Sequence, residues 1–224
     1  MNGRHELKHY INAADCAQLR SRLRVVARPD EHAGADGCYK VRSLYFDNYS
    51  DKAVAEKLAG LSKREKFRLR YYNDDTSFIR LEKKSKANRL AYKESAVMTE
   101  EQCRALLSGD YGCLKSAAEP LLMELYTKTR YQSLRPKNIV EYCREAYVYR
   151  AGNVRVTFDS GVRMSNSVAG FLAPQLSTIP AAGAGSVILE IKYDGFLPDV
   201  LRDLLQIGYR NQIEFSKYVA ARLV

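Results

Sequence analysis

Residues 63–72 read KREKFRLRYY, a run in which basic and apolar side chains alternate. Side chains on a β-strand point to opposite faces in turn, so Lys66, Arg68 and Arg70 share one face of the predicted strand. In an ordinary half-exposed sheet, the polar face carries mixed groups that are turned to water. This run instead predicts a strand with one face dominated by cations.

The same alternation recurs in further predicted strands. Charged or hydroxyl side chains share one face in each of the sets Arg4, Glu6 and Lys8; Arg80, Glu82, Lys84 and Lys86; Arg89 and Lys93; Tyr142 and Arg144; Arg155, Thr157 and Asp159; Glu190, Lys192 and Asp194. A solvated face explains any one strand, but like charges crowded across neighbouring strands repel one another. If the sheet closes into an eight-stranded barrel, this face becomes a lumen for one small ligand. A basic lumen predicts an elongated polyanion as that ligand.

Three glutamates, Glu6, Glu82 and Glu190, fall among these cations. A magnesium or manganese phosphate complex needs hard oxygen ligands, which carboxylates supply. The sequence therefore indicates a divalent metal, Mn²⁺ or Mg²⁺. The alternative, in which each glutamate only pairs with a neighbouring lysine, stays open.

The periodicity predicts a single domain over residues 1–224, of the α+β (mainly β) class: an antiparallel eight-stranded β-barrel tunnel with helices packed outside. The strands are expected at 3–11, 38–47, 64–73, 77–86, 89–97, 138–150, 153–160 and 186–194. Helices are expected at 13–26, 49–59, 100–108, 115–132, 198–207 and 215–224, with Asn12, Asn48 and Thr99 as N-caps. Short links at 73–76 and 86–88 predict hairpins. Residues 28–37 and 165–185 are expected to be weakly structured, and whether 165–185 is a lid is open.

Composition limits the partners. The chain has 224 residues, 36 Lys and Arg against 26 Asp and Glu, and a formal charge of +10, which predicts an anionic partner. The five cysteines show no C-x-x-C spacing, and no stretch has the length and apolarity of a membrane span, so a cytoplasmic location is expected. Nucleic acid ranks last among anionic partners, because no nucleic-acid-binding signature is present.

An ordered set of motifs runs along nearly the whole chain. These are RHELKHYI (4–11), VRSLYFDN (41–48), KFRLRYY (66–72), LEKKSK (81–86), YKES (92–95), Y-x-R (142–144), RVTFD (155–159), LEIKYDG (189–195) and FSKY (215–218). The set resembles the triphosphate tunnel metalloenzymes of the CYTH-like superfamily, and specifically the VTC domain of the polyphosphate polymerase branch.

The resemblance implies that the tunnel binds the triphosphate of ATP and transfers the γ-phosphoryl group to inorganic polyphosphate, with a divalent metal and release of ADP. It implies catalytic roles for Lys217, Arg68, Arg70, Arg144 and Arg155. Phosphate contacts are expected from Lys8, Lys84, Lys93, Tyr142 and Ser216, together with the other inward cations Arg4, Lys66 and Lys192. Glu190 matches the metal-binding glutamate of the family, and Glu6 and Glu82 are further candidates. Relatives in membrane assemblies imply a membrane-protein partner, with this chain peripheral to the complex, whereas the oligomeric state is open.

One position departs from the hydrolytic branches of the superfamily. Those branches open with E-x-E-x-K, whereas this chain reads R-x-E-x-K, with Arg4 at the first acidic position. The change removes a carboxylate and adds a cation, which favours a polymerase. A phosphohydrolase of triphosphate or polyphosphate, and a non-catalytic polyphosphate-binding module, remain alternatives.

Overall fold

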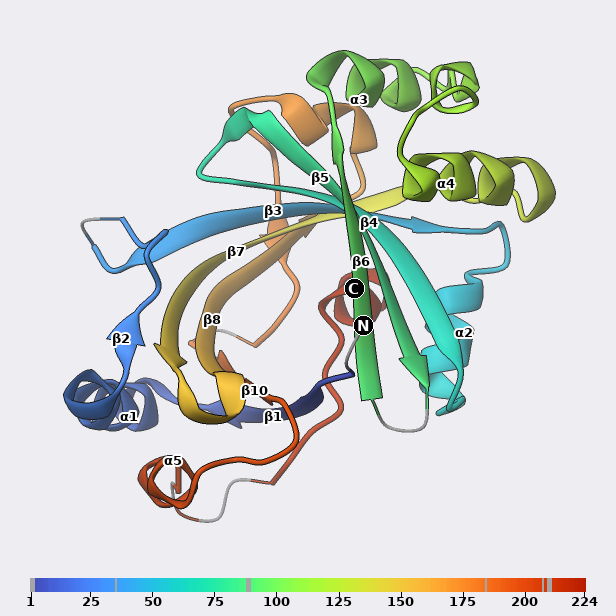
Figure 1. Cartoon of the computed structure of the whole chain (residues 1–224). Coiled ribbons are helices and arrows are strands. Elements are labelled where there is room, and N and C mark those ends of the chain that lie inside the picture. Colours follow the sequence, from blue (N-terminus) through green and yellow to red (C-terminus); the bar gives the residue numbers. More distant parts are fainter. Residues whose placement is uncertain (1–2, 35, 88–89, 184, 207, 209–210) are drawn as a thin grey trace.

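A single sheet, in which nearly all of the strands are antiparallel neighbours, curls around a central space (Figure 1). The computed structural model describes residues 3–224 except 35, 88–89, 184, 207 and 209–210. The strand order along the sheet is β1 (His5–Ile11), β10 (Val187–Tyr193), β8 (Val154–Ser165), β7 (Arg135–Tyr149), β3 (Cys38–Asp47), β4 (Arg64–Tyr72), β5 (Asp75–Ala87) and β6 (Leu90–Met98). Two short strands, β2 (Arg28–Pro29) and β9 (Ile179–Pro180), pair with β7 and β8. These eight long strands confirm the predicted class.

The two end strands of the sheet, β1 and β6, meet at an antiparallel bridge between Arg4 and Ala91. Each residue donates its backbone N–H to the other's carbonyl, at 3.1 and 3.2 Å. This seam brings the first and last strands of the path together, so the alternating inner residues face one another across a lumen.

Turn residues account for one of the two predicted hairpins. Asn73 and Asp74 both have positive φ, 51° and 59°, which suits a tight two-residue turn between β4 and β5. The other predicted hairpin, at 86–88, joins β5 to β6 and includes residue 88, which lies outside the described residues.

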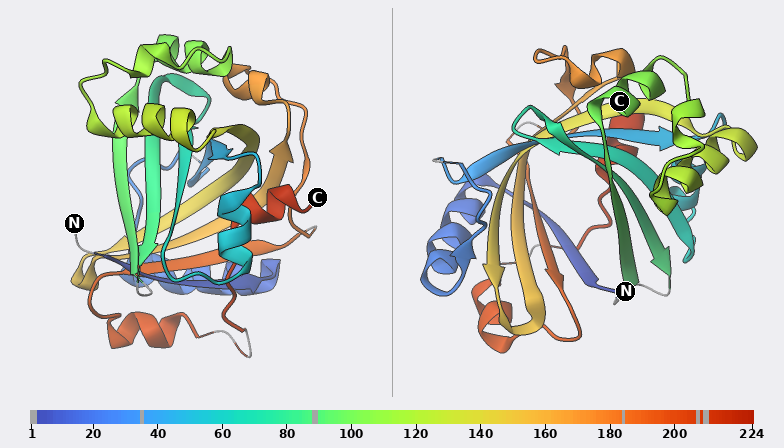
Figure 2. Two further views of the ribbon diagram at one scale, coloured as in Figure 1. Left: turned by 90° about the vertical axis from the view of Figure 1, so that its right-hand side faces the viewer. Right: turned by 45° about the horizontal axis from the view of Figure 1, so that its top comes forward.

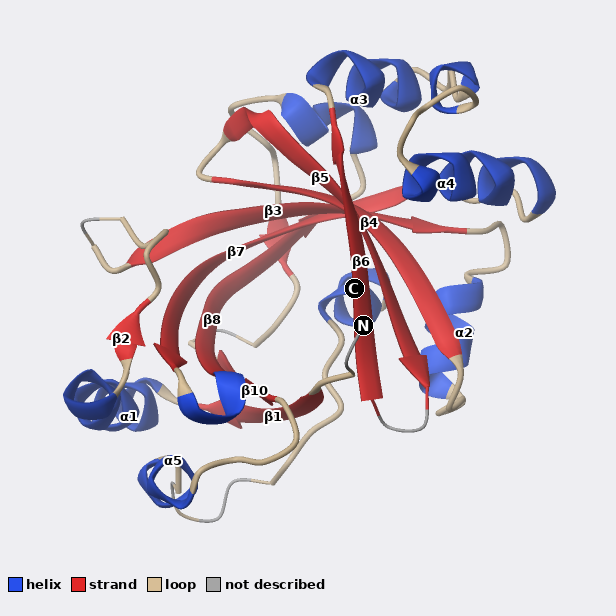
Figure 3. Cartoon of the chain, in the orientation of Figure 1, coloured by secondary structure: helices blue, strands red, loops and turns tan. Residues whose placement is uncertain are grey.

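The helices are α1 (Ala13–Val26), α2 (Lys52–Leu58), α3 (Glu100–Leu107), α4 (Pro120–Tyr131), α5 (Asp199–Leu204) and α6 (Lys217–Arg222). Figure 3 shows α1, α3, α4 and α5 on the outside of the curved sheet. Asn12 and Thr99 each form a reciprocal capping box, which confirms these predicted caps. The prediction for α2 is wrong: the helix begins at Lys52 with Asp51 as N-cap. Asn48 still accepts a 2.9 Å hydrogen bond from the Lys52 N–H.

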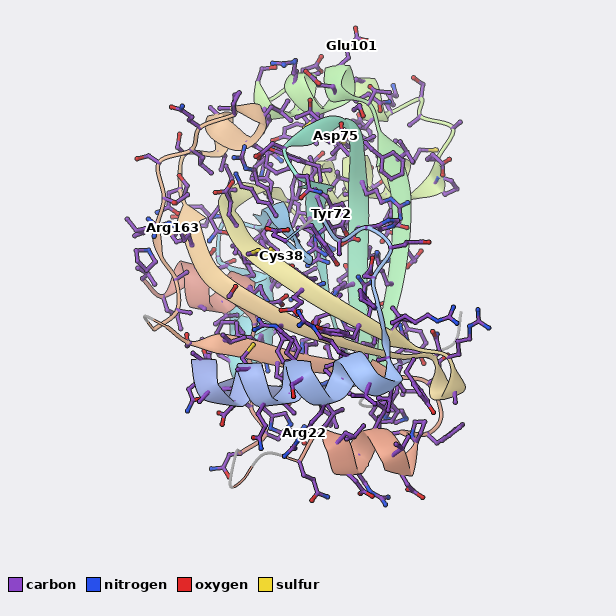
Figure 4. The ribbon with its side chains drawn as sticks, turned by 90° about the vertical axis from the view of Figure 1, so that its left-hand side faces the viewer. Arg22, Cys38, Tyr72, Asp75, Glu101 and Arg163 are labelled. Carbon is purple, nitrogen blue, oxygen red and sulfur yellow. The ribbon has the colours of Figure 1, made fainter. Side chains whose placement is uncertain are left out.

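Two apolar clusters lie between the helices and the outer face of the sheet. One joins α3 and α4 to β3, β4, β5 and β7, and the other joins α1 and α5 to β1, β8 and β10. Arg22 lies between α1 and α5 (Figure 4), where it donates to the carbonyls of Leu204 and Gln206. A third cluster includes inner residues of β3 and β7 together with α6, and α6 packs beside α2 (Figure 2, left).

The described residues of 165–185 are more ordered than predicted, and those around Phe171 lie on the outer face of the sheet. Phe171, in a short 3-10 turn at Val168–Leu172, is fully buried in the outer cluster. The buried guanidinium of Arg42 donates to the carbonyls of Phe171 and Ala173 at 3.0 and 2.5 Å. None of the described residues in this segment lines the lumen, so the structure gives it no role as a lid.

No helix among the described residues combines the length and apolar character that a bilayer crossing requires.

Candidate functional site

The lumen forms a cavity of about 390 Å³. Its lining comes from seven of the eight long strands, from α2 and α6, and from the segment that precedes α6. Among the predicted site residues, the lining includes Arg4, Glu6, Lys8, Lys66, Arg68, Arg70, Lys84, Lys93, Arg144, Arg155, Lys192 and Ser216. The alternation of side chains along the strands therefore placed all of these residues except Ser216, which the family resemblance supplied, on the correct face.

Three lysines form a row across neighbouring strands: Lys66 on β4 lies opposite Lys84 on β5, which lies opposite Lys93 on β6. Neither Lys66 nor Lys84 forms an ion pair with a carboxylate that the structure describes. Burial and the neighbouring Lys8 and Arg68 lower the pKa of Lys66 to about 8. Burial, Lys192 and Arg68 lower the pKa of Lys84 well below its ordinary value. This row favours an anionic ligand, because an anion would relieve the repulsion between the ammonium groups.

Arg68 and Arg70 are buried and held by the wall behind them. Arg68 Nε lies 2.6 Å from Glu82 Oε2, and its Nη1 lies 3.2 Å from the Tyr45 hydroxyl. Arg70 Nε donates to Ser43 Oγ at 3.0 Å, and its Nη2 donates to the Tyr142 hydroxyl at 2.9 Å. Planar guanidinium groups fixed in this way present their remaining N–H groups in a defined direction, which suits phosphate oxygens.

Glu82 is completely buried beneath these cations. Besides Arg68, its carboxylate faces Lys93 Nζ at 2.5 Å and Arg70 Nη1 at 3.8 Å. Although burial alone would raise it, these three cations hold the pKa of Glu82 far below its usual range. The Glu82 carboxylate is therefore already paired with cationic side chains of the protein.

Two other predicted metal ligands, Glu6 and Glu190, lie side by side on β1 and β10. Lys8 Nζ is 3.5 Å from Glu6 and 3.3 Å from Glu190, and Lys192 Nζ is 3.5 Å from Glu6 and 2.7 Å from Glu190. Burial opposes the ionisation of both glutamates, and the charge of Glu190 also opposes that of Glu6, but Lys8 and Lys192 prevail and lower the pKa of both. For Glu190, a hydrogen bond with Glu6 and the charge of Arg144 lower the pKa further. Two ionised carboxylates thus lie together in the tunnel wall.

The oxygen donors near Glu190 fit a metal that also carries phosphate oxygens. Thr157 lies directly opposite Glu190 across β8 and β10, is 2% exposed, and its Oγ1 has no hydrogen-bond partner among the described residues. No group of three or more His, Cys, Asp or Glu side chains that could hold a metal occurs among the described residues. A hard cation here would therefore complete its coordination with ligand oxygens or water.

Lys217 and Arg144 both contact Asp159, which was not among the predicted site residues. The carboxylate of Asp159 lies 2.6 and 2.8 Å from Arg144 and 2.5 Å from Lys217 Nζ. The motif RVTFD had placed Asp159 on the inner face, but its pairing with a helix 58 residues away leaves no periodic signal. Tyr45 was also missed; three cations, Arg68, Lys66 and Arg70, overcome the effect of burial and lower its pKa to about 7.

The remaining predicted residues have structural partners. Arg155 donates to Asp30 and to the Tyr39 hydroxyl, both at 2.7 Å. The Arg4 guanidinium pairs with Asp194 at 2.9 Å beside the seam. Ser216 Oγ accepts from the Val219 N–H as the N-cap of α6. Tyr142 and Lys217 lie behind the cavity lining, with the Lys217 ammonium 4.7 Å from the centre of the Tyr142 ring.

A family model described as the VTC domain matches residues 3–224. No curated protein sequence is significantly similar to the chain. Solved structures with a similar fold include a proposed adenylate cyclase of Bacillus halodurans, with 13% identity, a TM-score of 0.55 and coverage of 96% of this chain and 95% of that one. Another is HpAC1 from Hippeastrum, a proposed adenylyl cyclase with a dominant triphosphatase activity. It has 13% identity and a TM-score of 0.58, and the match covers 100% of this chain and 96% of that one.

Proposed function

The chain belongs to the VTC domain family, within the CYTH-like triphosphate tunnel fold, and on this premise we propose that it is a metal-dependent polyphosphate polymerase. In the proposed reaction, the tunnel binds the triphosphate of ATP, and the terminal oxygen of an inorganic polyphosphate chain attacks the γ-phosphorus. The bond between the γ-phosphorus and the β-bridging oxygen breaks, and ADP leaves with the electron pair.

The observation that carries the choice of a polymerase is the match of the VTC family model to residues 3–224, and the state of the carboxylates among the tunnel cations agrees with it. The pKa values of Glu6, Glu82, Asp159 and Glu190 are all lowered, so these carboxylates are poor proton acceptors. Hydrolysis benefits from a base that takes a proton from water. A polyphosphate end already carries an anionic oxygen and needs no such base.

Positioning and charge neutralisation are the main demands of phosphoryl transfer, because its transition state is loose. Arg68 and Arg70, fixed by Glu82, Ser43 and Tyr142, would hold phosphate oxygens in defined directions. Lys66, Lys84 and Lys93 would act as point charges along which a chain can slide. Arg144 and Lys217 would neutralise charge on the transferred group.

Divalent metal, Mn²⁺ or Mg²⁺, would be held by Glu190 and Glu6, because Thr157, whose hydroxyl has no hydrogen-bond partner among the described residues, lies directly opposite Glu190. When bound, the metal supplies Lewis-acid neutralisation of phosphate oxygens. Lys8 and Lys192 hold both glutamates ionised and ready to accept a cation.

A triphosphate phosphohydrolase is the second candidate. It is favoured by the similarity in fold to HpAC1, which has a dominant triphosphatase activity. Polyanion binding without turnover is the third. We also propose a cytoplasmic location at the periphery of a membrane-protein complex that takes up the product; this partner rests on the family resemblance.

The test incubates the purified protein with ATP and Mn²⁺ and follows ADP, free phosphate and chain length together. Lengthening chains with stoichiometric ADP are expected, and both should be lost in Lys217→Ala and Glu190→Ala. Lys40→Ala, on the outer face and paired with Asp74, is the matched control and should retain activity. Phosphate without chains would support the hydrolase, and ATP binding without turnover would overturn both enzymatic proposals.

A further inference from the structure

Asp159 is a buried carboxylate that joins two cations from distant parts of the chain. It lies on the inner face of β8, is 0% exposed and faces Arg144 in the register of β7 and β8. Arg144 approaches it with two nitrogens, Nε to Oδ1 at 2.6 Å and Nη2 to Oδ2 at 2.8 Å. Lys217 Nζ reaches the same Oδ2 at 2.5 Å. One carboxylate therefore fixes the separation of both cations.

The backbone that carries Lys217 is held independently of Asp159. Ser216 caps α6, and the next residue, Tyr218, stacks on Tyr45 with ring centres 5.0 Å apart. The Tyr218 hydroxyl donates to Asp47 at 2.8 Å. These contacts place the first turn of α6, but a lysine side chain has four rotatable bonds beyond it. Asp159 is the contact that sets the direction of the ammonium group.

Asp159 does not itself line the cavity, whereas Arg144 does. Despite complete burial, Arg144 and Lys217 hold the pKa of Asp159 far below its ordinary value, so the carboxylate is ionised at neutral pH. A buried negative charge behind a phosphate site opposes anion binding electrostatically. Its presence is explained if orientation of the two cations contributes more to the reaction than their full charge contributes to binding.

We propose that Asp159 is the positioning residue of the tunnel, and that it holds Arg144, which lines the cavity, and Lys217, which lies behind the lining, as one rigid pair beside the phosphoryl group in transfer. The proposal rests on the phosphoryl-transfer function proposed above. It predicts opposite effects on affinity and turnover when the charge of Asp159 is removed. A merely structural role would lower both together.

The test is Asp159→Asn, which nearly preserves shape and removes one negative charge. Affinity for tripolyphosphate, measured by calorimetry, is expected to be unchanged or higher. The turnover number is expected to fall about 10- to 100-fold, because misplacement of a catalytic group by about 1 Å costs on this order. The control is Asp199→Asn, which makes the same charge change on the exposed surface of α5 and should alter neither quantity. Equal losses of affinity and turnover, or no loss of turnover, would overturn the proposal.

A double-mutant cycle tests whether Asp159 acts through Lys217. The loss of turnover that Asp159→Asn causes is expected to be smaller in the Lys217→Met background than in the wild type, because only the misplacement of Arg144 then remains, whereas fully additive losses would contradict the proposal. If Asp159→Asn fails to fold, NMR of the wild-type protein with ¹⁵N-labelled lysine tests the contact between Lys217 and Asp159. A slowly exchanging Lys217 ammonium signal supports this contact, and a signal averaged like those of exposed lysines refutes it. If the wild type shows no turnover, the proposed function fails. The affinity for tripolyphosphate and the ammonium signal still test the contact between Lys217 and Asp159.

Discussion

Lys66 and Lys84 lie directly opposite each other on β4 and β5, and neither forms an ion pair with a carboxylate that the structure describes. Like charges placed opposite each other across two strands destabilise the sheet. The tunnel therefore contains a built-in repulsion that an anionic ligand would remove.

This repulsion predicts that Lys84→Met stabilises the empty protein. Its free energy of unfolding in urea should rise by about 0.5–1 kcal/mol, the range for a cross-strand pair. In saturating tripolyphosphate the wild type should be the more stable protein. The variant loses a contact with the ligand, so ligand binding stabilises it less. A variant that is less stable than wild type in both conditions would contradict the anion-binding role of the row.

Ligand affinity should depend on pH through Lys66 and Tyr45. Below its pKa of about 8 Lys66 is charged, and above its pKa of about 7 Tyr45 gains a negative charge, so both titrations weaken anion binding as pH rises. Affinity for tripolyphosphate should therefore fall between pH 7 and 9, by about one tenfold step per pH unit for each coupled proton.

Calorimetry in buffers of different ionisation enthalpy checks this dependence by measuring proton uptake. Lys66→Met should remove the change in affinity near pH 8, and Tyr45→Phe should remove the change near pH 7. The control Lys40→Met, on the outer face, should keep both changes in affinity. A pH profile that is identical in all variants would assign the dependence to other groups.

Thr157→Val should separate stability from metal binding. The change removes a buried hydroxyl that has no partner among the described residues, so the free energy of unfolding should rise by about 1–3 kcal/mol. If the hydroxyl assists the metal held by Glu190, the affinity of the tripolyphosphate complex for Mn²⁺ should fall roughly tenfold. Electron paramagnetic resonance measures bound Mn²⁺, and Thr157→Ser, which keeps the hydroxyl, should bind it as the wild type does. Unchanged Mn²⁺ binding in Thr157→Val would show that the hydroxyl has no part in the site.

Arg42→Ala should be strongly destabilising. Its buried guanidinium pairs with Glu141 and holds the Tyr71 hydroxyl and two carbonyls of the 165–185 segment. Its loss leaves the largely buried Glu141 paired with Lys40 alone among the described residues, at 3.3 Å, and removes the donor to the Ala173 carbonyl, at a cost of about 3–5 kcal/mol in urea unfolding.

The matched control is Arg163→Ala. Arg163 anchors the same segment at Thr178 from an exposed position, so the expected loss is about 0.5–1.5 kcal/mol. Equal losses of unfolding free energy in the two variants would show that the burial of Arg42 adds nothing to the stability that it provides.

Strand alternation predicted the tunnel wall from the sequence because a period of two assigns every side chain to a face. The run 63–72 placed Lys66, Arg68 and Arg70 in the lumen, and the structure has them there. Local chemistry also predicted the start of α1 and α3, since the capping residues lie within the helical segment that they cap.

Features that depend on distant segments could not be predicted in this way. Helix α2 begins later than expected because Asp47, at the end of β3, accepts the N–H groups of Ala53 and Val54. Asp159 acquires its role only when α6 folds back onto β8. The described residues of 165–185 were predicted to be weakly structured because their order comes partly from Arg42, a buried cation on the outer face of β3, far away in the sequence.

The pairing of β1 with β10 has a consequence for the way the molecule is made. His5 lies opposite Tyr193, and the Lys8 ammonium reaches the carbonyl of Phe215. On the ribosome, the first strand must wait for nearly the entire chain to emerge before it finds its neighbours. Such non-local pairing makes folding slow, because the loop closure is costly. A nascent chain that stalls before residue 187 lacks β10, the strand that pairs along the whole of β1, so its cationic strands stay exposed to any polyanion in the surrounding solution.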